Sequence, residues 1–435
     1  MNTFSIISDE TTKNTMTMHT AVYKELSSGV QQKGYVRFGL QIKELNFKSM
    51  EEMNPQELHL SANIIKQFNL PVGADFEVRI IDNEWHIGPY IGMLIAKKEI
   101  AMAEKLKKLS SYVHNYQMIN GAILAFSLEG VYSNHLQIKG YMYNPKLKEW
   151  VKGIFPYPQS ILKKTALPRK MREHFQTVLG FRIFNSNTFN KWEMHKCLFN
   201  HKEIKPYLPE TILYKNKKDV LSFLDEYEQM YIKPLSGKKG VGIQRIKKEG
   251  EYALFNDGLQ ENKIPINSLA DELNQLHPGQ FLLQQGLELK LFEQSIVDFR
   301  LVLMKDYHGK WKDVGLIGRR GVAGKITSNR SGGGQVERGE ETLSEVYRLS
   351  HSEVTSIRQQ FSELALKIGE ALDKSGVHFG RLGIDLALDR ELNLWVIEIN
   401  HKSPNDYTAF YAGEEDLFYE TRLLNMLYCK RLAGF

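Results

Sequence analysis

The segment from Gly383 to Asn400, GIDLALDRELNLWVIEIN, constrains the fold of this chain more than any other part of the sequence. Its apolar residues alternate and predict two strands, 384–388 and 394–399, joined by a polar turn. Because side chains alternate between the two faces of a strand, the second strand should divide its residues between two faces. Trp395, Ile397 and Ile399 are expected on one face, and Glu398 and Asn400 on the other.

Two carboxylates of this hairpin are expected to face each other. If Glu391 and Leu392 lie at its centre, Asp385 and Glu398 are directly opposite, with Cβ atoms about 5 Å apart, and like charges so placed repel. A cation between them would relieve the repulsion, and two carboxylates with the Asn400 amide form an oxygen-only ligand set that suits Mg²⁺ or Mn²⁺. The alternative is a half-buried hairpin whose outer face is simply acidic.

A second segment, Tyr231–Ile243, combines a short apolar run with a loop rich in glycine and lysine. Lys233 stands at the end of the predicted strand, and Gly237, Gly240 and Gly242 follow in the loop. Such glycines let backbone N–H groups approach a phosphate closely. The loop matches neither a Walker A motif nor a Rossmann motif, because no helix follows it. Taken alone, a hairpin turn rich in glycine and lysine is more often just a solvated turn.

Together the two segments resemble the ATP-grasp superfamily, and the resemblance extends over about residues 185–412. It implies that Lys191 and Lys233 bind the nucleotide, with 236–242 as the phosphate flap that includes Ser236. It also implies metal binding by the residues named above: Asp385, Glu398 and Asn400.

The same resemblance implies further site residues. The segment 280–287 resembles the strand and hinge that contact adenine, although Gln284 and Gln285 replace the residues usual there. The remaining expected positions are Leu287 and Asn329 at the nucleotide, and Arg300, Arg319 and Lys402 as cations that orient a carboxylate and its acyl phosphate.

Within the superfamily, the chain resembles the YheC/YheD-like endospore coat-associated proteins. The matching motifs are Leu208–Thr211 (LPET), Asp298–Arg300 (DFR) and Asn329–Gly333 (NRSGG). The implied activity is an ADP-forming carboxylate-amine or carboxylate-thiol ligase that uses ATP and Mg²⁺, acting on an amino acid or peptide. Two alternatives are an ATP-binding coat scaffold without turnover and an ATP-grasp kinase. Coat proteins are further implied partners.

The bulk composition is that of a globular protein. The chain has 435 residues, of which 42% are hydrophobic and 25% charged, with two cysteines and no apolar run of 18 residues. No signal peptide is expected, and the two cysteines favour a reducing, cytoplasmic location. The net charge of +6 comes from dispersed basic residues, so nucleic acid is not expected as a substrate.

The predicted fold is α/β (α+β), with three parts. A small β-rich module over 1–87 and a pre-ATP-grasp α/β domain over 88–184 precede the ATP-grasp domain at 185–435, whose flap subdomain spans about 196–285. The sequence further predicts a strand at 36–42, parallel strands at 90–96 and 121–127 around a helix at 99–118, and helices at 350–375 and 417–432. His195 and Cys197 are expected on a helix beside the core, and no internal repeat is evident.

Overall fold

The computed structural model describes residues 3–27, 32–71, 73–237, 240–328, 333–402, 404 and 407–435. The chain forms two compact units, which are described separately. The first contains residues 1–187, 305–310 and 419–435, and the second contains 188–304 and 311–418. No helix among the described residues is long and apolar enough to cross a membrane.

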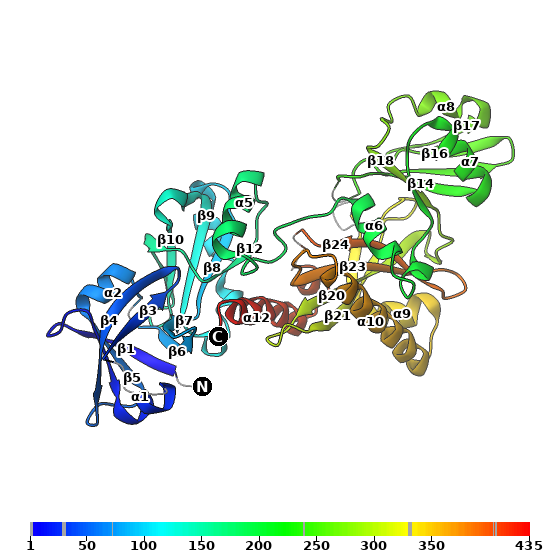
Figure 1. Cartoon of the computed structure of the whole chain (residues 1–435). Helices are drawn as coiled ribbons and strands as arrows, with labels where there is room; N and C mark the ends of the chain where they lie inside the picture. Colours follow the sequence, from blue (N-terminus) through cyan, green and yellow to red (C-terminus); the bar gives the residue numbers. More distant parts are fainter. Residues whose placement is uncertain are drawn as a thin grey trace. The chain divides into compact units, whose positions relative to one another are not determined.

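Seven strands of the first unit close a barrel in the order β1-β5-β2-β4-β3-β7-β6 (Figure 1). They are β1 (Thr3–Asp9), β2 (Thr15–His19), β3 (Lys33–Phe38), β4 (Gln41–Met50), β5 (Glu57–Ser61), β6 (Asp75–Ile81) and β7 (Glu84–Gly88). Helices α1 (Thr20–Leu26) and α2 (Ala62–Phe68) follow β2 and β5.

The single strand expected at 36–42 is wrong, because the chain turns at Gly39 between β3 and β4. Gly39 has a φ of +60°, and a Cβ at this position would lie 2.1 Å from the Tyr157 carbonyl oxygen. Only glycine has both the backbone freedom and the small size that this turn requires.

The rest of the first unit is built on a five-stranded sheet in the order β11-β10-β9-β8-β12. Its strands are β8 (Tyr90–Ala96), β9 (Ala122–Tyr132), β10 (Gln137–Asn144), β11 (Glu149–Pro156) and β12 (Ser160–Lys163), with η3 (Ser133–His135) after β9 and α5 (Arg169–Leu179) after β12. The parallel pairing of β8 and β9 was predicted and is confirmed. The end of α12 (Glu415–Leu432) joins this unit, where Met426 and Cys429 are buried in its core.

One continuous helix was expected at 99–118, and this prediction is wrong. Four short helical turns replace it: η1 (Glu99–Ala101), α3 (Met102–Leu106), η2 (Ser110–Tyr112) and α4 (Tyr116–Ile119). The breaks between the last three of these turns fall at 107–109 and 113–115. Asn115 lies in the second break, and its short polar side chain favours a turn over a helix interior.

The second unit contains an antiparallel sheet in the order β13-β18-β14-β15-β16-β17. Its strands are β13 (Thr211–Leu213), β14 (Gln229–Pro234), β15 (Gln244–Glu249), β16 (Tyr252–Asn256), β17 (Glu261–Pro265) and β18 (Phe281–Gln285). The helices α7 (Lys217–Tyr227), η5 (Ile266–Ser268) and α8 (Leu269–Glu272) belong to the same part of the chain. Val220 and Leu224 of α7 are buried in a core that this sheet contributes to.

A second sheet of this unit has the order β22-β21-β20-β23-β24, with β19 paired to β20. The strands are β19 (Leu291–Phe292), β20 (Ser295–Lys305), β21 (Trp311–Arg320), β22 (Gln335–Arg338), β23 (Arg381–Leu388) and β24 (Leu394–Asn400). Helices α9 (Gly339–Tyr347) and α10 (His351–Asp373) share its core, and α6 (Lys191–Phe199) packs there through Met194 and Leu198 (Figure 1). The unit also contains η4 (Lys205–Tyr207) and α11 (Tyr407–Tyr411). The predicted helices near 350–375 and 417–432 correspond to α10 and α12.

The turn between β23 and β24 is held by the buried side chain of Asp389. Its carboxylate accepts hydrogen bonds from the Glu391 and Asn393 backbone N–H groups, from the Asn393 amide, and from the Trp395 indole at 2.9 Å. Burial acts to raise the pKa of Asp389, but these hydrogen bonds outweigh it and hold the pKa below the usual range. One side chain therefore holds the turn of the hairpin together.

Replacing Asp389 by alanine should lower the free energy of unfolding by about 2–4 kcal/mol at neutral pH, because it leaves several donors without their acceptor. Since the pKa of Asp389 is lowered on folding, the difference from the wild type should narrow only below about pH 4. Urea unfolding as a function of pH measures both effects. Asp306→Ala, at the more exposed turn between β20 and β21, is the matched control and should cause a smaller loss. Equal losses for the two variants would contradict this role of Asp389.

Candidate functional site

A β-bulge in β24 determines how the hairpin presents its acidic residues. Asp385 pairs with Glu398 as predicted, but the next pair is Leu386 with Val396, so Ile397 is an extra residue. The expected sharing of one face by Trp395, Ile397 and Ile399 is therefore wrong. Bulges of this kind reorient side chains beside functional sites.

The bulge reverses which residues of β24 reach the core. Leu394, Val396 and Ile399 are in the hydrophobic core, while Ile397 and Glu398 are half-buried. All of these except Leu394 also line a cavity. The Trp395 indole instead donates its hydrogen bond to Asp389. Strict alternation along the strand cannot predict this arrangement.

Asp385 is 5% exposed and is surrounded by cationic and amide donors. Arg300 donates through Nη2 to Oδ2 at 3.1 Å, Arg319 Nη2 lies 3.0 Å from the same oxygen, and Asn400 Nδ2 donates to it at 3.1 Å. A Cβ at Gly383 would lie 3.0 Å from Arg300 Cδ, so glycine leaves room for that arginine. Burial acts to raise the pKa of Asp385, but the two arginines outweigh it and hold the pKa below its usual range.

Asp298 is a site residue to which the sequence analysis assigned no role. Arg319 donates to its two carboxylate oxygens at 2.6 and 2.7 Å, and the Ser328 hydroxyl donates at 2.6 Å. Asp298 lies two residues before Arg300 on β20. Residues with this spacing on a strand point to the same face of the sheet. Asp298, Arg319, Asp385 and Arg300 thus form a row of alternating charges.

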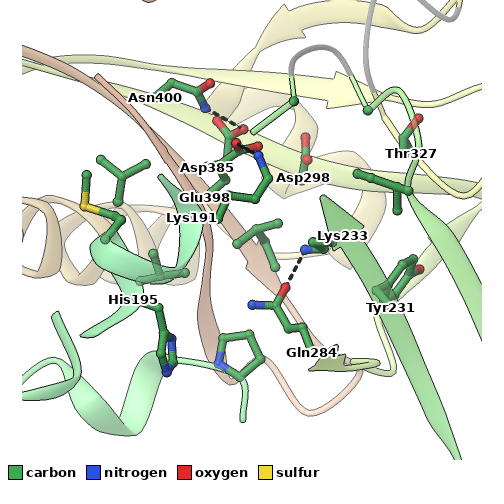
Figure 2. A pocket seen from close by; sticks show the side chains of 18 of the residues that line it. Lys191, His195, Tyr231, Lys233, Gln284, Asp298, Thr327, Asp385, Glu398 and Asn400 are labelled. Atoms are coloured by element: carbon green, nitrogen blue, oxygen red, sulfur yellow. Dashed lines mark hydrogen bonds and ion pairs between the residues drawn. The ribbon is translucent and has the colours of Figure 1, made fainter. Parts of the chain in front are cut away.

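Glu398 lies in a more open environment than Asp385. Its side chain is 38% exposed, and its Oε1 accepts a hydrogen bond from Lys191 Nζ at 2.7 Å (Figure 2). Lys191 is the first residue of α6, whose start is fixed by a capping box between Asn190 and Glu193. The helix cap therefore positions the lysine that pairs with this carboxylate.

Lys233 approaches the cavity from the other sheet. Its Nζ donates to Gln284 Oε1, and Gln284 Nε2 in turn donates to the Thr211 hydroxyl at 3.1 Å (Figure 2). Burial lowers the pKa of Lys233 to about 8, although Glu398 acts in the opposite direction. A modest change of pH can therefore change the charge of this lysine.

The cavity, of about 580 Å³, brings together most of the predicted site residues. Those that line it are Lys191, Lys233, Gly237, Gly240, Gln284, Gln285, Leu287, Arg300, Arg319, Asp385, Glu398, Asn400 and Lys402. Ser236 and Gly242 are described but are not among the lining residues. Asn329 lies outside the described residues. The predicted site is therefore largely assembled around a single cavity.

His195 also lines this cavity, so the expectation that it lies merely beside the core is incomplete. Its ring stacks on Trp192 at 5.5 Å, and burial lowers its pKa to about 4. Cys197, on the same helix, packs against the hydrophobic core as expected.

The residues around Asp385 have the ligand chemistry for a hard divalent cation. Two carboxylates and an amide oxygen form the set that suits Mg²⁺, and the carboxylates face each other across paired strands. No group of three His, Cys, Asp or Glu residues able to hold a metal was found in the part of the chain that is described.

The two facing carboxylates should respond differently to neutralisation. Asp385→Asn leaves buried arginines without full compensation and should lower the free energy of unfolding by about 3–5 kcal/mol. Glu398→Gln removes half of a partly exposed ion pair and should change it by less than about 1 kcal/mol. Chemical denaturation without added ligand measures both. A large loss for Glu398→Gln would indicate that this carboxylate is structural.

Comparisons with known proteins place these features in a family. The family described as "YheC/D like ATP-grasp" matches residues 180–432. The chain is 26% identical over 423 residues to the endospore coat-associated protein YheD of Bacillus subtilis (strain 168), covering 92% of this chain and 89% of YheD. It is 27% identical over 218 residues to YheC of the same organism, covering 49% of this chain and 59% of YheC.

Solved structures give weaker similarities. The ATP-grasp ligase PsnB with a minimal precursor has a TM-score of 0.43 at 13% identity, covering 75% of this chain and 95% of PsnB. The VanG D-Ala:D-Ser ligase from Enterococcus faecalis has a TM-score of 0.46 at 11% identity, covering 78% of this chain and 98% of VanG. The family match itself extends over more than half of the chain, from before α6 to the end of α12. This chain therefore belongs to the YheC/D-like ATP-grasp family.

Proposed function

We propose that this protein is an ADP-forming ligase that uses Mg-ATP to activate a carboxylate as an acyl phosphate, which an amine or thiol then attacks. The observation that carries the proposal is the meeting of Lys191, Lys233, Asp385 and Glu398 around one cavity. These groups come from two different sheets and one helix of the second unit. An amino acid or peptide is the proposed substrate class.

In this proposal, the two lysines bind the phosphate chain of ATP. Lys191 and Lys233 supply positive charge on the cavity wall, and Gly237 and Gly240 of the loop also line it. Gly240 has a φ of +75°, a backbone conformation that L side chains rarely adopt. Fixed cations and backbone donors stabilise the charge that develops during phosphoryl transfer. Gln284, Gln285 and Leu287 are the proposed adenine contacts.

The divalent cation would be held by Asp385, Glu398 and Asn400. When bound, Mg²⁺ neutralises phosphate charge and fixes the geometry of the reacting phosphoryl group. Asp385 is already oriented by arginines, while Glu398 is oriented by Lys191. The chain's own side chains therefore hold both carboxylates in place.

The proposed catalytic cations are Arg300, Arg319 and Lys402. The two arginines contact Asp385 in the structure, and Lys402 lies two residues beyond Asn400 on the cavity wall. Guanidinium groups bind carboxylates and phosphates through directed hydrogen bonds. We infer that these three cations orient the carboxylate of the substrate. The two arginines would do so while they remain paired with Asp385, which positions them.

A scaffold without turnover is the second candidate function. Two curated relatives are named endospore coat-associated proteins, and the pairing of Asp385 with two arginines is also compatible with a structural role. We propose a cytoplasmic protein that associates with spore-coat proteins in either case. A kinase that phosphorylates a hydroxyl would use the same cations but would form no acyl phosphate.

The affinity for ADP should fall as pH rises through about 8, because an anionic ligand favours protonated Lys233 and the pKa of this lysine is lowered to about 8. Above that pH the affinity for ADP should fall by up to about tenfold per pH unit. Fluorescence titration with a labelled ADP between pH 6.5 and 9.5 measures it. Lys233→Arg should remain charged and show a flatter profile. Identical slopes for the two proteins would contradict the assignment.

The ligase proposal predicts that ADP release requires a carboxylate substrate and that hydroxylamine traps the acyl phosphate as a hydroxamate. A screen of amino acids and peptides with coupled ADP detection tests it. Lys402→Met should reduce carboxylate-dependent turnover by about tenfold or more. The affinity for ADP should stay nearly unchanged, because the Lys402 side chain is proposed to contact the substrate and not the nucleotide. Lys325→Met, an exposed lysine outside the cavity lining, is the matched control.

Other outcomes of this screen distinguish the alternatives. ADP release with stable phosphorylation of a hydroxyl and no hydroxamate would identify a kinase. ADP binding without release for any substrate of a broad panel would support the scaffold.

A further inference from the structure

A buried histidine connects the end of β24 to the start of α6. His401, next to Asn400 in the sequence, is 5% exposed, and its Nε2 accepts a hydrogen bond from the Phe189 backbone N–H at 3.1 Å. Phe189 lies two residues before Lys191. The histidine therefore ties the candidate metal-binding strand to the segment that carries a candidate phosphate-binding lysine.

The two partners determine the tautomer of His401. Because a backbone N–H can only donate, Nε2 must be unprotonated. Nδ1 faces the Ile399 carbonyl oxygen at 3.3 Å, and that oxygen can only accept, so the proton is on Nδ1. The two ring nitrogens therefore have different hydrogen-bonding roles, with Nε2 as the acceptor and Nδ1 as the donor.

The segment that His401 holds makes two further contacts. The Lys191 backbone N–H donates to the Leu235 carbonyl oxygen at 3.2 Å, just beyond β14 and two residues after Lys233. The Lys191 side chain donates to Glu398 of β24 at 2.7 Å. Residues 189–191 thus touch the ends of both β14 and β24, which belong to different sheets.

We propose that His401 is a positioning residue that couples the carboxylate end of β24 to the phosphate-loop end of β14 through residues 189–191. The inference rests on the proposed function for the identity of the ligands, because Mg²⁺ and nucleotide are the groups these two ends would bind. His401 itself lines the cavity, and in this proposal it acts by holding residues 189–191 rather than as a ligand of Mg²⁺ or nucleotide. By holding Phe189, His401 keeps Lys191 where its side chain reaches Glu398 and its backbone N–H donates to the Leu235 carbonyl oxygen.

Packing is the competing explanation for a buried histidine. The His401 ring lies 5.5 Å from the Phe379 ring in an edge-to-face arrangement and 6.4 Å from the Phe189 ring. If packing were its whole role, substitutions would change stability without changing how Mg²⁺ and nucleotide affect each other. The coupling between two ligands is a free energy that is measured separately from the stability of the fold.

Two substitutions separate these explanations. His401→Gln can place an amide oxygen near the position of Nε2, whereas the shorter His401→Asn cannot reach Phe189. Phe379→Leu removes a ring contact but leaves the hydrogen bond, and serves as the packing control. For each protein, labelled ADP is titrated with and without Mg²⁺, and the ratio of the two dissociation constants gives the coupling.

We expect the Mg²⁺ coupling of His401→Asn to fall at least about fivefold, with His401→Gln and Phe379→Leu within about twofold of the wild type. Amide hydrogen exchange without any ligand should show Phe189 N–H protected in the wild type and His401→Gln but not in His401→Asn. An unprotected Phe189 amide in the wild type would overturn the proposal even if the variants fail to fold.

The remaining outcomes are equally decisive. If a folded His401→Asn keeps the Mg²⁺ coupling of the wild type, the role of His401 is overturned. The same holds if Phe379→Leu loses as much coupling as His401→Asn, and both outcomes leave the ligase proposal intact. Failure of the wild type to bind ADP with or without Mg²⁺ would overturn both.

Discussion

A row of four paired charges, three of them buried, organises the second unit of this protein. Asp298, Arg319, Asp385 and Arg300 alternate in sign across one face of β20, β21 and β23. Each ion is expensive to bury alone, and the row is favourable only when every charge has its partners. The Ser328 hydroxyl binds one end, and the Asn400 amide binds Asp385, so neighbouring segments take their positions from this row.

The row also explains why two facing carboxylates have different properties. Asp385 is buried among arginines, which keep it ionised despite its burial. Glu398, directly across the hairpin, is half-buried and pairs with a lysine from a helix. The geometry therefore gives the two facing carboxylates different exposure and different cationic partners.

Local sequence patterns predicted much of the fold. The turn at Asp389 and the apolar alternation identified the hairpin, and the pairing of Asp385 with Glu398 was predicted and is confirmed. The parallel pair of β8 and β9 was also predicted. The errors at 36–42 and 99–118 are both missed interruptions: the chain turns at Gly39 in the first segment, and breaks at 107–109 and 113–115 divide the second.

By itself, the sequence determined which residue types can form the site, because Lys191, Lys233 and the acidic hairpin stand in recognisable local patterns. The tertiary structure decided their partners. The bulge at Ile397 places Val396 in the core, and Asp298 pairs with Arg319. His401 accepts a hydrogen bond from Phe189, which lies 212 residues earlier in the chain. Periodicity describes the faces of one element, whereas these contacts join different elements. They depend on how strands and helices pack to bury apolar surface and pair every buried charge.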